Sequence, residues 1–300
     1  HSEKKAIRLE AFASSYLSLA AQQYYLTEFH GDWADEMHVV ETPLSYGIKT
    51  IDSKIGARAM QYAHACYLLS LDKEAQENSG TVVGGQLAWG GSWRMDFEVD
   101  HHNRLHLLAG INDYASDYTL APKTNFTTPA MLTTISQDGT GTVTRRFHTW
   151  ARRYGIHQPE RTRLTLLNNW EATYFDFNQQ VLTSIIHDAA DMGFELFLLD
   201  DGWFGNKHPR NNDDAGLGDW ETNHTKLPEG IGQLVREATA QGIRFGIWLE
   251  PEMVNEDSDL YRAHPDWAVH TPGHTPALGR NQLVLDLCRR EVQDYIIENI

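Results

Sequence analysis

The sequence predicts two domains, an antiparallel β-sandwich in residues 1–157 and an α/β domain of alternating strands and helices in residues 158–300. In the first region, short runs of alternating apolar and polar residues are separated by turn residues, a pattern typical of sandwiches. In the second region, continuous apolar runs alternate with stretches of helical spacing, as in sheets of parallel strands. A length of 300 residues also exceeds that of most single small domains.

The composition is that of a globular protein, with 41% hydrophobic and 22% charged residues. A formal net charge of -16 argues against nucleic acid or an anionic membrane as a partner, because both would repel the chain. No apolar run approaches the roughly 20 residues that span a bilayer. The printed sequence opens without a basic and apolar leader, and it does not indicate a cellular location.

The β-rich region contains four clear alternating runs, at residues 6–12, 37–41, 93–99 and 104–111. Turn residues lie between such runs, at residues 78–80, 90–92, 102–103 and 139–141. Helical spacing appears from residue 142 to 153, and the polar stretch 154–161 with Pro159 is the expected domain boundary.

Three apolar runs in the second region predict parallel strands, at residues 164–170, 194–199 and 243–249. Apolar residues at helical spacing follow each strand, at residues 181–192, 231–238 and 292–300. Asp176 and Gln179 resemble a capping box for the first helix, and Gly193 predicts its end. A complete (β/α)8 barrel takes about 250 residues. We therefore expect only about the first three strand–helix units of a barrel, with the chain stopping inside this domain.

Acidic and aromatic residues follow all three predicted strands: Trp170 after the first, Asp200, Asp201 and Trp203 after the second, and Trp248, Glu250 and Glu252 after the third. Because the carboxyl ends of parallel strands share one rim, we expect these side chains to converge there. The adjacent aspartates with aromatic surface from Trp203 and Phe204 suit a polyhydroxylated ligand. The alternatives are a turn with two solvated acids, core packing for Trp248, and glutamates bonded to loop amides.

The other candidate clusters give weaker signals. Asp100, His101, His102 and His106 are metal-ligating residue types, but they lie at an expected β-turn, so we interpret them as a solvated turn. No phosphate-binding glycine motif or nucleophile elbow is present. The sequence therefore predicts no metal and no cofactor.

Several motifs together resemble glycoside hydrolase family 36, the large bacterial and fungal α-galactosidases (melibiases). They are residues 169–172 (NWEA), 198–205 (LLDDGWFG), 218–220 (GDW), 245–254 (FGIWLEPEMV), 264–267 (HPDW) and 283–287 (LVLDL). The resemblance covers the chain from about residue 160 onward and extends loosely over the β-rich half. It implies a β-sandwich, with its start missing here, followed by a (β/α)8 TIM barrel.

The resemblance implies a retaining hydrolase that releases terminal α-linked galactose from melibiose- or raffinose-type α-galactoside oligosaccharides, without metal or cofactor. Asp200 and Asp201 match acids that hold the galactose O4 and O6 hydroxyls. Trp170 and Trp248 match indoles that line the galactose pocket, and Arg280 matches an arginine that reaches the sugar. The family also makes a homotetramer a candidate assembly.

One departure from the family concerns the chemistry itself. A retaining glycosidase needs two carboxyl groups about 5–5.5 Å apart. The family's nucleophile lies in a Lys-Trp-Asp motif that this sequence lacks, so we expect both catalytic aspartates beyond Ile300. The alternatives are an α-N-acetylgalactosaminidase, a galactosyl-transferring relative and a non-catalytic sugar-binding module.

Overall fold

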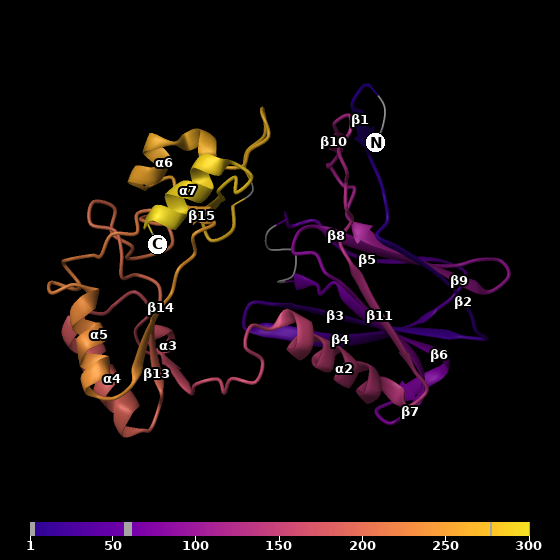
Figure 1. Ribbon diagram of the computed structural model, residues 1–300, viewed down its shortest axis with the longest axis horizontal. Helices are drawn as coiled ribbons and strands as arrows, with labels where there is room; N and C mark the ends of the chain where they lie inside the picture. The colour runs from indigo at the N-terminus through magenta and orange to yellow at the C-terminus, as the bar shows by residue number, and fades with distance from the viewer. Residues whose placement is uncertain (1–3, 57–61, 277, 300) are drawn as a thin grey trace. The chain divides into compact units, whose positions relative to one another are not determined.

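The computed structural model describes residues 4–56, 62–276 and 278–299. The chain forms two compact units, residues 1–160 and residues 161–300 (Figure 1). The first unit is mostly β-structure, and the second alternates strands with helices.

The first unit contains two antiparallel sheets that pack as the predicted sandwich. The first sheet is ordered β11-β7-β6-β3-β4, and the second is ordered β2-β9-β8-β5. The strands of the first sheet are β3 (Tyr24–Asp32), β4 (Asp35–Leu44), β6 (Cys66–Gln76), β7 (Ser79–Leu87) and β11 (Met131–Ser136). Those of the second sheet are β2 (Ser15–Ala20), β5 (Gly47–Ser53), β8 (Trp93–Val99) and β9 (Arg104–Ile111).

The sandwich core follows directly from the alternation in the sequence. Along β8, Trp93, Met95, Phe97 and Val99 are buried, and the residues between them are more exposed. They form one cluster with buried residues of β3, β6 and β7 from the other sheet. The period of two therefore assigns one face of the strand to the core.

Two details of the first unit differ from the predictions. The alternating run at residues 6–12 forms only the short strand β1 (Ile7–Leu9), which pairs with β10 (Tyr118–Leu120). The predicted turn at residues 139–141 is wrong, because helix α2 (Gly139–Trp150) begins there and continues as a short π-helix, η2 (Ala151–Gly155). Gly139 has a φ of +79°, and a Cβ at this position would lie 2.3 Å from the carbonyl oxygen of Gln76. Close approach of two backbones therefore explains this glycine.

The second unit is built on a parallel sheet in the order β12 (Leu166–Asn168), β13 (Leu196–Leu199) and β14 (Arg244–Ile247). The helices that follow these strands are α4 (Gln179–Asp191), α5 (Ile231–Ala240) and α7 (Arg290–Asn299). Apolar residues of α4, α5 and the strands form one buried cluster. The three predicted strand–helix units are confirmed, and Ile300 lies outside the described residues.

The ends of α4 test two predictions. The capping box of Asp176 and Gln179 is wrong, because Asn178 is the N-cap and its side chain accepts a 3.0 Å hydrogen bond from the N–H of Val181. Gln179 instead exchanges hydrogen bonds with Glu229. The predicted end is confirmed: Gly193 has a φ of +84°, which glycine adopts without steric cost.

A long excursion separates β14 from α7. It contains a short antiparallel pair, β15 (Met253–Val254) and β16 (Leu283–Val284), with α6 (Asp259–Ala263) and the 3-10 turn η3 (Pro265–Trp267). Val292 of α7 belongs to the buried cluster of this excursion, and the partly buried Tyr295 and Ile296 pack against that cluster. No helix in the described ranges is long and apolar enough to span a bilayer.

Candidate functional site

The carboxyl ends of the three parallel strands lie at one edge of the sheet. Leu198 of β13 pairs with Asn168 of β12 and with Gly246 of β14. Hydrogen bonds continue past the strand ends, because the N–H of Trp248 donates to the carbonyl of Leu199 at 2.8 Å. The sequence therefore places its acidic and aromatic residues at a common edge, as the strand pattern predicts.

Asp200 is half-buried at this edge and is anchored from the neighbouring strand. Its carboxylate accepts the N–H of Asp201 at 2.7 Å and the side-chain amide of Asn168. The side-chain oxygen of Asn168 accepts the N–H of Trp170 at 2.7 Å, so Asn168 links the short helix α3 (Trp170–Thr173) to Asp200. Each oxygen of Asp200 receives one of these protein donors, and a carboxylate oxygen can accept a further hydroxyl.

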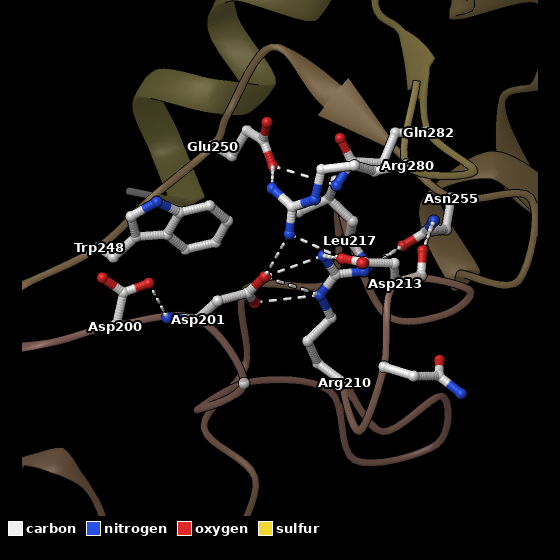
Figure 2. A network of polar contacts seen from close by, with 12 residues as sticks. Asp200, Asp201, Arg210, Asp213, Leu217, Trp248, Glu250, Asn255, Arg280 and Gln282 are labelled. Atoms are coloured by element: carbon white, nitrogen blue, oxygen red, sulfur yellow. Dashed lines mark hydrogen bonds and ion pairs between the residues drawn. The ribbon is translucent and has the colours of Figure 1, made fainter. Parts of the chain in front are cut away.

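Asp201 is in a different environment, because its carboxylate is buried against Arg210. The Nε of Arg210 donates to Oδ1 of Asp201 at 3.0 Å, and Nη2 donates to Oδ2 at 2.9 Å (Figure 2). The side chains of Arg210 and Asp201 are 0% and 2% exposed. This is a bidentate pair, the strongest arrangement of arginine and carboxylate.

The remaining donors of Arg210 are also paired. Nη1 donates to the carbonyl of Ala215 at 3.3 Å and to the side chain of Asn255 at 3.1 Å. Nη2 donates a second bond to the Asp213 carboxylate at 3.1 Å. The buried guanidinium therefore has partners for all five of its N–H groups.

Arg280 lies on the solvent side of this network, with a side chain that is 43% exposed. Its Nη2 donates to Asp213 at 2.7 Å and lies 3.5 Å from Oδ2 of Asp201 (Figure 2). Nη1 lies 4.0 Å from the carboxylate of Glu250, which also accepts from Gln282. Arg280 has a φ of +53°, a conformation that costs about 1–3 kcal/mol in a non-glycine residue. The structure thus brings together Arg280 and Asp201, which are far apart in the sequence.

The two predicted indoles are half-buried at the edge of the sheet. Trp170 packs edge-on against Tyr174 and Phe175, with ring centroids 5.3 and 5.0 Å apart. The ring of Trp248 lies parallel to that of Phe204, with ring centroids 6.4 Å apart. Trp248 therefore packs against the core and also keeps part of its side chain exposed.

The predicted aromatic surface of Trp203 and Phe204 is wrong. Their exposed fractions are 4% and 0%, and both belong to the core of the second unit. The indole N–H of Trp203 donates to the carbonyl of Trp248 at 3.0 Å. After Asp201 the chain turns inward at Gly202, which has a φ of +99°, and this turn buries both rings.

Lys226 supports the loops around the acids and was not predicted. Its Nζ donates to the carbonyls of Phe175 and Gly202, both at 2.9 Å, and of Arg210 at 3.1 Å. Burial lowers the pKa of Lys226 to about 8, while the charges of Asp201 and Asp176 oppose that shift. The lysine therefore joins three loop segments at one point.

Sequence reasoning missed Arg210, Asp213 and Lys226, because the long loop between β13 and α5 has no periodic pattern. One signal was available: a carboxylate that follows a buried strand directly needs a cation or several donors if it is enclosed. That argument predicts a partner for Asp201 without identifying it.

The Asp100 cluster in the first unit is a turn, as predicted. The carboxylate of Asp100 accepts the N–H groups of Arg104 and His102, both at 2.9 Å, and lies 3.1 Å from Nε2 of His106. The bonds from Arg104 and His106 lower the pKa of Asp100 to about 2. Among the residues with described positions, no group of three or more His, Cys, Asp or Glu could hold a metal ion.

Comparison with known families covers nearly the whole chain. The family model described as Melibiase matches residues 125–300, and that of the glycosyl hydrolase family 36 N-terminal domain matches residues 1–121. The chain belongs to the melibiase family, glycoside hydrolase family 36. Its architecture is therefore the β-sandwich of this family followed by the first part of its TIM barrel.

Individual relatives are similar over most of this chain. Alpha-galactosidase AgaA of Geobacillus stearothermophilus is 40% identical over 273 residues, which are 90% of this chain and 37% of that protein. The bifunctional alpha-galactosidase/sucrose kinase AgaSK of Mediterraneibacter gnavus is 36% identical over 98% of this chain and 31% of its own length. The crystal structure of AgaA superimposes with a TM-score of 0.93, covering 98% of this chain and 41% of that one. The chain thus spans 31–41% of the length of these relatives.

Proposed function

We propose that this chain supplies the sugar-recognition part of a retaining α-galactosidase, which removes terminal α-linked galactose from oligosaccharides of the raffinose and melibiose type. The observation that carries the proposal is that half-buried Asp200 and the network of Arg280 with Asp201 and Asp213 lie at the carboxyl edge of β12, β13 and β14. In barrels of this kind, that edge is where substrates bind. Two substituted forms of AgaA have been crystallised, one in complex with stachyose and the other with raffinose, which supports the substrate class.

The residue roles follow from the donors and acceptors that are present. Asp200 accepts hydrogen bonds from galactose hydroxyls, and Arg280 donates to ring substituents of the sugar. Asp201 accepts hydrogen bonds from the sugar through the oxygen lone pairs that Arg210 does not use. Trp170 and Trp248 supply apolar faces for the sugar C–H groups.

The catalytic carboxyl groups belong elsewhere. A retaining enzyme needs two carboxyl groups about 5–5.5 Å apart that flank the scissile glycosidic bond, one as the nucleophile and one as the acid/base. Asp200 and Asp201 are consecutive residues, and Asp201 is neutralised by the buried Arg210. Neither has the freedom to act as a nucleophile, so we assign both catalytic aspartates to barrel strands after residue 300 in the whole protein.

The test is a hydrolysis assay of the whole protein on p-nitrophenyl α-galactoside, with the matching α-N-acetylgalactosaminide as the competing substrate. We expect turnover of the galactoside and release of galactose that is initially the α-anomer, observed by NMR. A preference for the N-acetyl substrate would reassign the specificity. Galactose binding without any hydrolysis would instead support a non-catalytic sugar-binding module.

A further inference from the structure

We propose that Arg210 is a positioning residue of the sugar site, which holds Asp201 directly and Arg280 through Asp213. The inference rests on the proposed function, because it assigns Arg210 to the same site. Its basis is a continuous chain of short contacts between a buried guanidinium and an exposed one.

The first part of this chain is the fork between Arg210 and Asp201. Two roughly parallel bonds of 3.0 and 2.9 Å fix the plane of the carboxylate, whereas a single contact would leave it free to rotate. Both groups are nearly enclosed, with exposures of 0% and 2%, so little water can compete for the bonds of the fork. The fork therefore decides which Asp201 lone pairs face the site.

The second part runs through Asp213. Its Oδ1 atom accepts from Nη2 of Arg210 at 3.1 Å and from Nη2 of Arg280 at 2.7 Å. One carboxylate oxygen therefore connects the buried arginine to the exposed one. Arg210 fixes Asp213, and Asp213 in turn fixes the orientation of Arg280.

Asn255 holds the same loop from the other side. Its oxygen accepts from Arg210 at 3.1 Å and from the N–H of Leu217 at 3.0 Å. Its amide donates to the carbonyls of Asp213 at 2.8 Å and Asn281 at 3.0 Å. This side chain, which is 0% exposed, ties the Arg210 loop to the turn that carries Arg280.

The charges show why the loss of Arg210 would reach the sugar. Arg280 already lies 3.5 Å from Oδ2 of Asp201. If the fork of Arg210 is lost, Arg280 is the guanidinium next to the buried Asp201 carboxylate. A direct pair between the two would draw Arg280 away from the substrate. Arg210 thus keeps Arg280 available for the sugar by neutralising Asp201.

The experiment compares Arg210→Lys and Asp213→Asn in the whole protein by steady-state hydrolysis of p-nitrophenyl α-galactoside. Lysine keeps the charge of Arg210 but cannot form the fork. Asparagine keeps the shape of Asp213 but removes the charge that orients Arg280. We expect each variant to lower kcat/KM by about 10-fold or more, mainly through a higher KM. Arg262→Gln is the control, because Arg262 is a half-exposed arginine that pairs with Asp257.

A double-mutant cycle separates positioning from a general loss of structure. If Asp213 acts through Arg280, Asp213→Asn should change KM less than about twofold when Arg280 is already Gln. Independent effects of the two substitutions, or an unchanged KM in Asp213→Asn, would overturn the inference about Arg210 and leave the proposed function standing. Asp213 is 37% exposed, so this variant provides the test even if Arg210→Lys does not fold.

A wild-type whole protein that neither binds galactose nor hydrolyses the galactoside would overturn the proposed function, and the inference with it.

Discussion

Asp200 and Asp201 are neighbours in the chain, yet their carboxylates have different partners. Asp200 is half-buried and accepts from a backbone N–H and an asparagine amide, which leaves it able to bind hydroxyls. Asp201 is enclosed with a guanidinium, so its charge is already balanced. At a strand end, one residue of displacement is enough to move a side chain from the solvent edge to the interior.

This difference predicts unequal effects on stability. Asp201→Ala should lower the free energy of unfolding by about 3–5 kcal/mol, because it leaves Arg210 buried without its counter-charge. Asp200→Ala should cost about 1 kcal/mol, since it removes only partly exposed hydrogen bonds. Urea unfolding of the two variants measures both values. Equal losses would contradict the assignment of Asp201 to a buried pair.

Asp100 gives a pH-dependent prediction for the first unit. Its pKa is lowered to about 2 in the folded chain from an ordinary value of 3.8. Its contribution to stability is therefore present above about pH 4 and is lost as the pH falls towards 2. Asp100→Asn should be less stable than wild type at pH 7, and the difference should shrink between pH 4 and 2. Acid unfolding followed by circular dichroism measures this, with Glu98→Gln, at an exposed carboxylate of β8, as a control.

At the scale of elements, local capping decides where α4 begins. Asn178 has an extended backbone, and its side chain accepts from Val181, which satisfies one of the free N–H groups of the first turn. The acidic residue two positions earlier has the right chemistry for a cap but lies outside the helix. A cap is thus selected by backbone geometry as well as by residue type.

This leads to a prediction that distinguishes the two candidate caps. Asn178→Ala should lower the free energy of unfolding by about 1 kcal/mol. Asp176→Ala should cost less, because Asp176 does not cap the helix. Thermal or urea unfolding of both variants provides the comparison. A larger loss for Asp176→Ala would restore the capping box.

At the scale of the whole molecule, the segment between the two compact units is exposed. Residues 152–163 are exposed throughout, and the division between the units falls after residue 160. Exposed connections of this kind are preferred sites of proteolysis.

Limited trypsin digestion should therefore cut first at Arg152, Arg153, Arg161 or Arg163. Mass spectrometry should detect one fragment that ends in this segment and one that begins there, both longer-lived than the intact chain. Early cuts inside either sheet system would show that the units are less compact than the structure indicates.

Much of the fold could be predicted because it depends on short-range patterns. The alternation of residues 93–99 determines which face of β8 is buried, and the apolar run at residues 194–199 determines the parallel strand β13. A charged pair directly after such a run must mark its end, because charges do not continue into an apolar core without partners. The three strand ends with their acids and indoles follow from the same reasoning.

Tertiary structure decided which residues actually meet. Arg210, Asp213 and Arg280 belong to loops without periodicity, and only the folded chain brings them within 3.5 Å of Asp201 or of one another. It also buried Trp203 and Phe204, which the sequence indicates as exposed. The sequence by itself determined the strands and the edge at which the site lies, because hydrophobic periodicity is local. The partners of each charge were decided by the tertiary fold, because enclosing a carboxylate requires a cation from a distant loop.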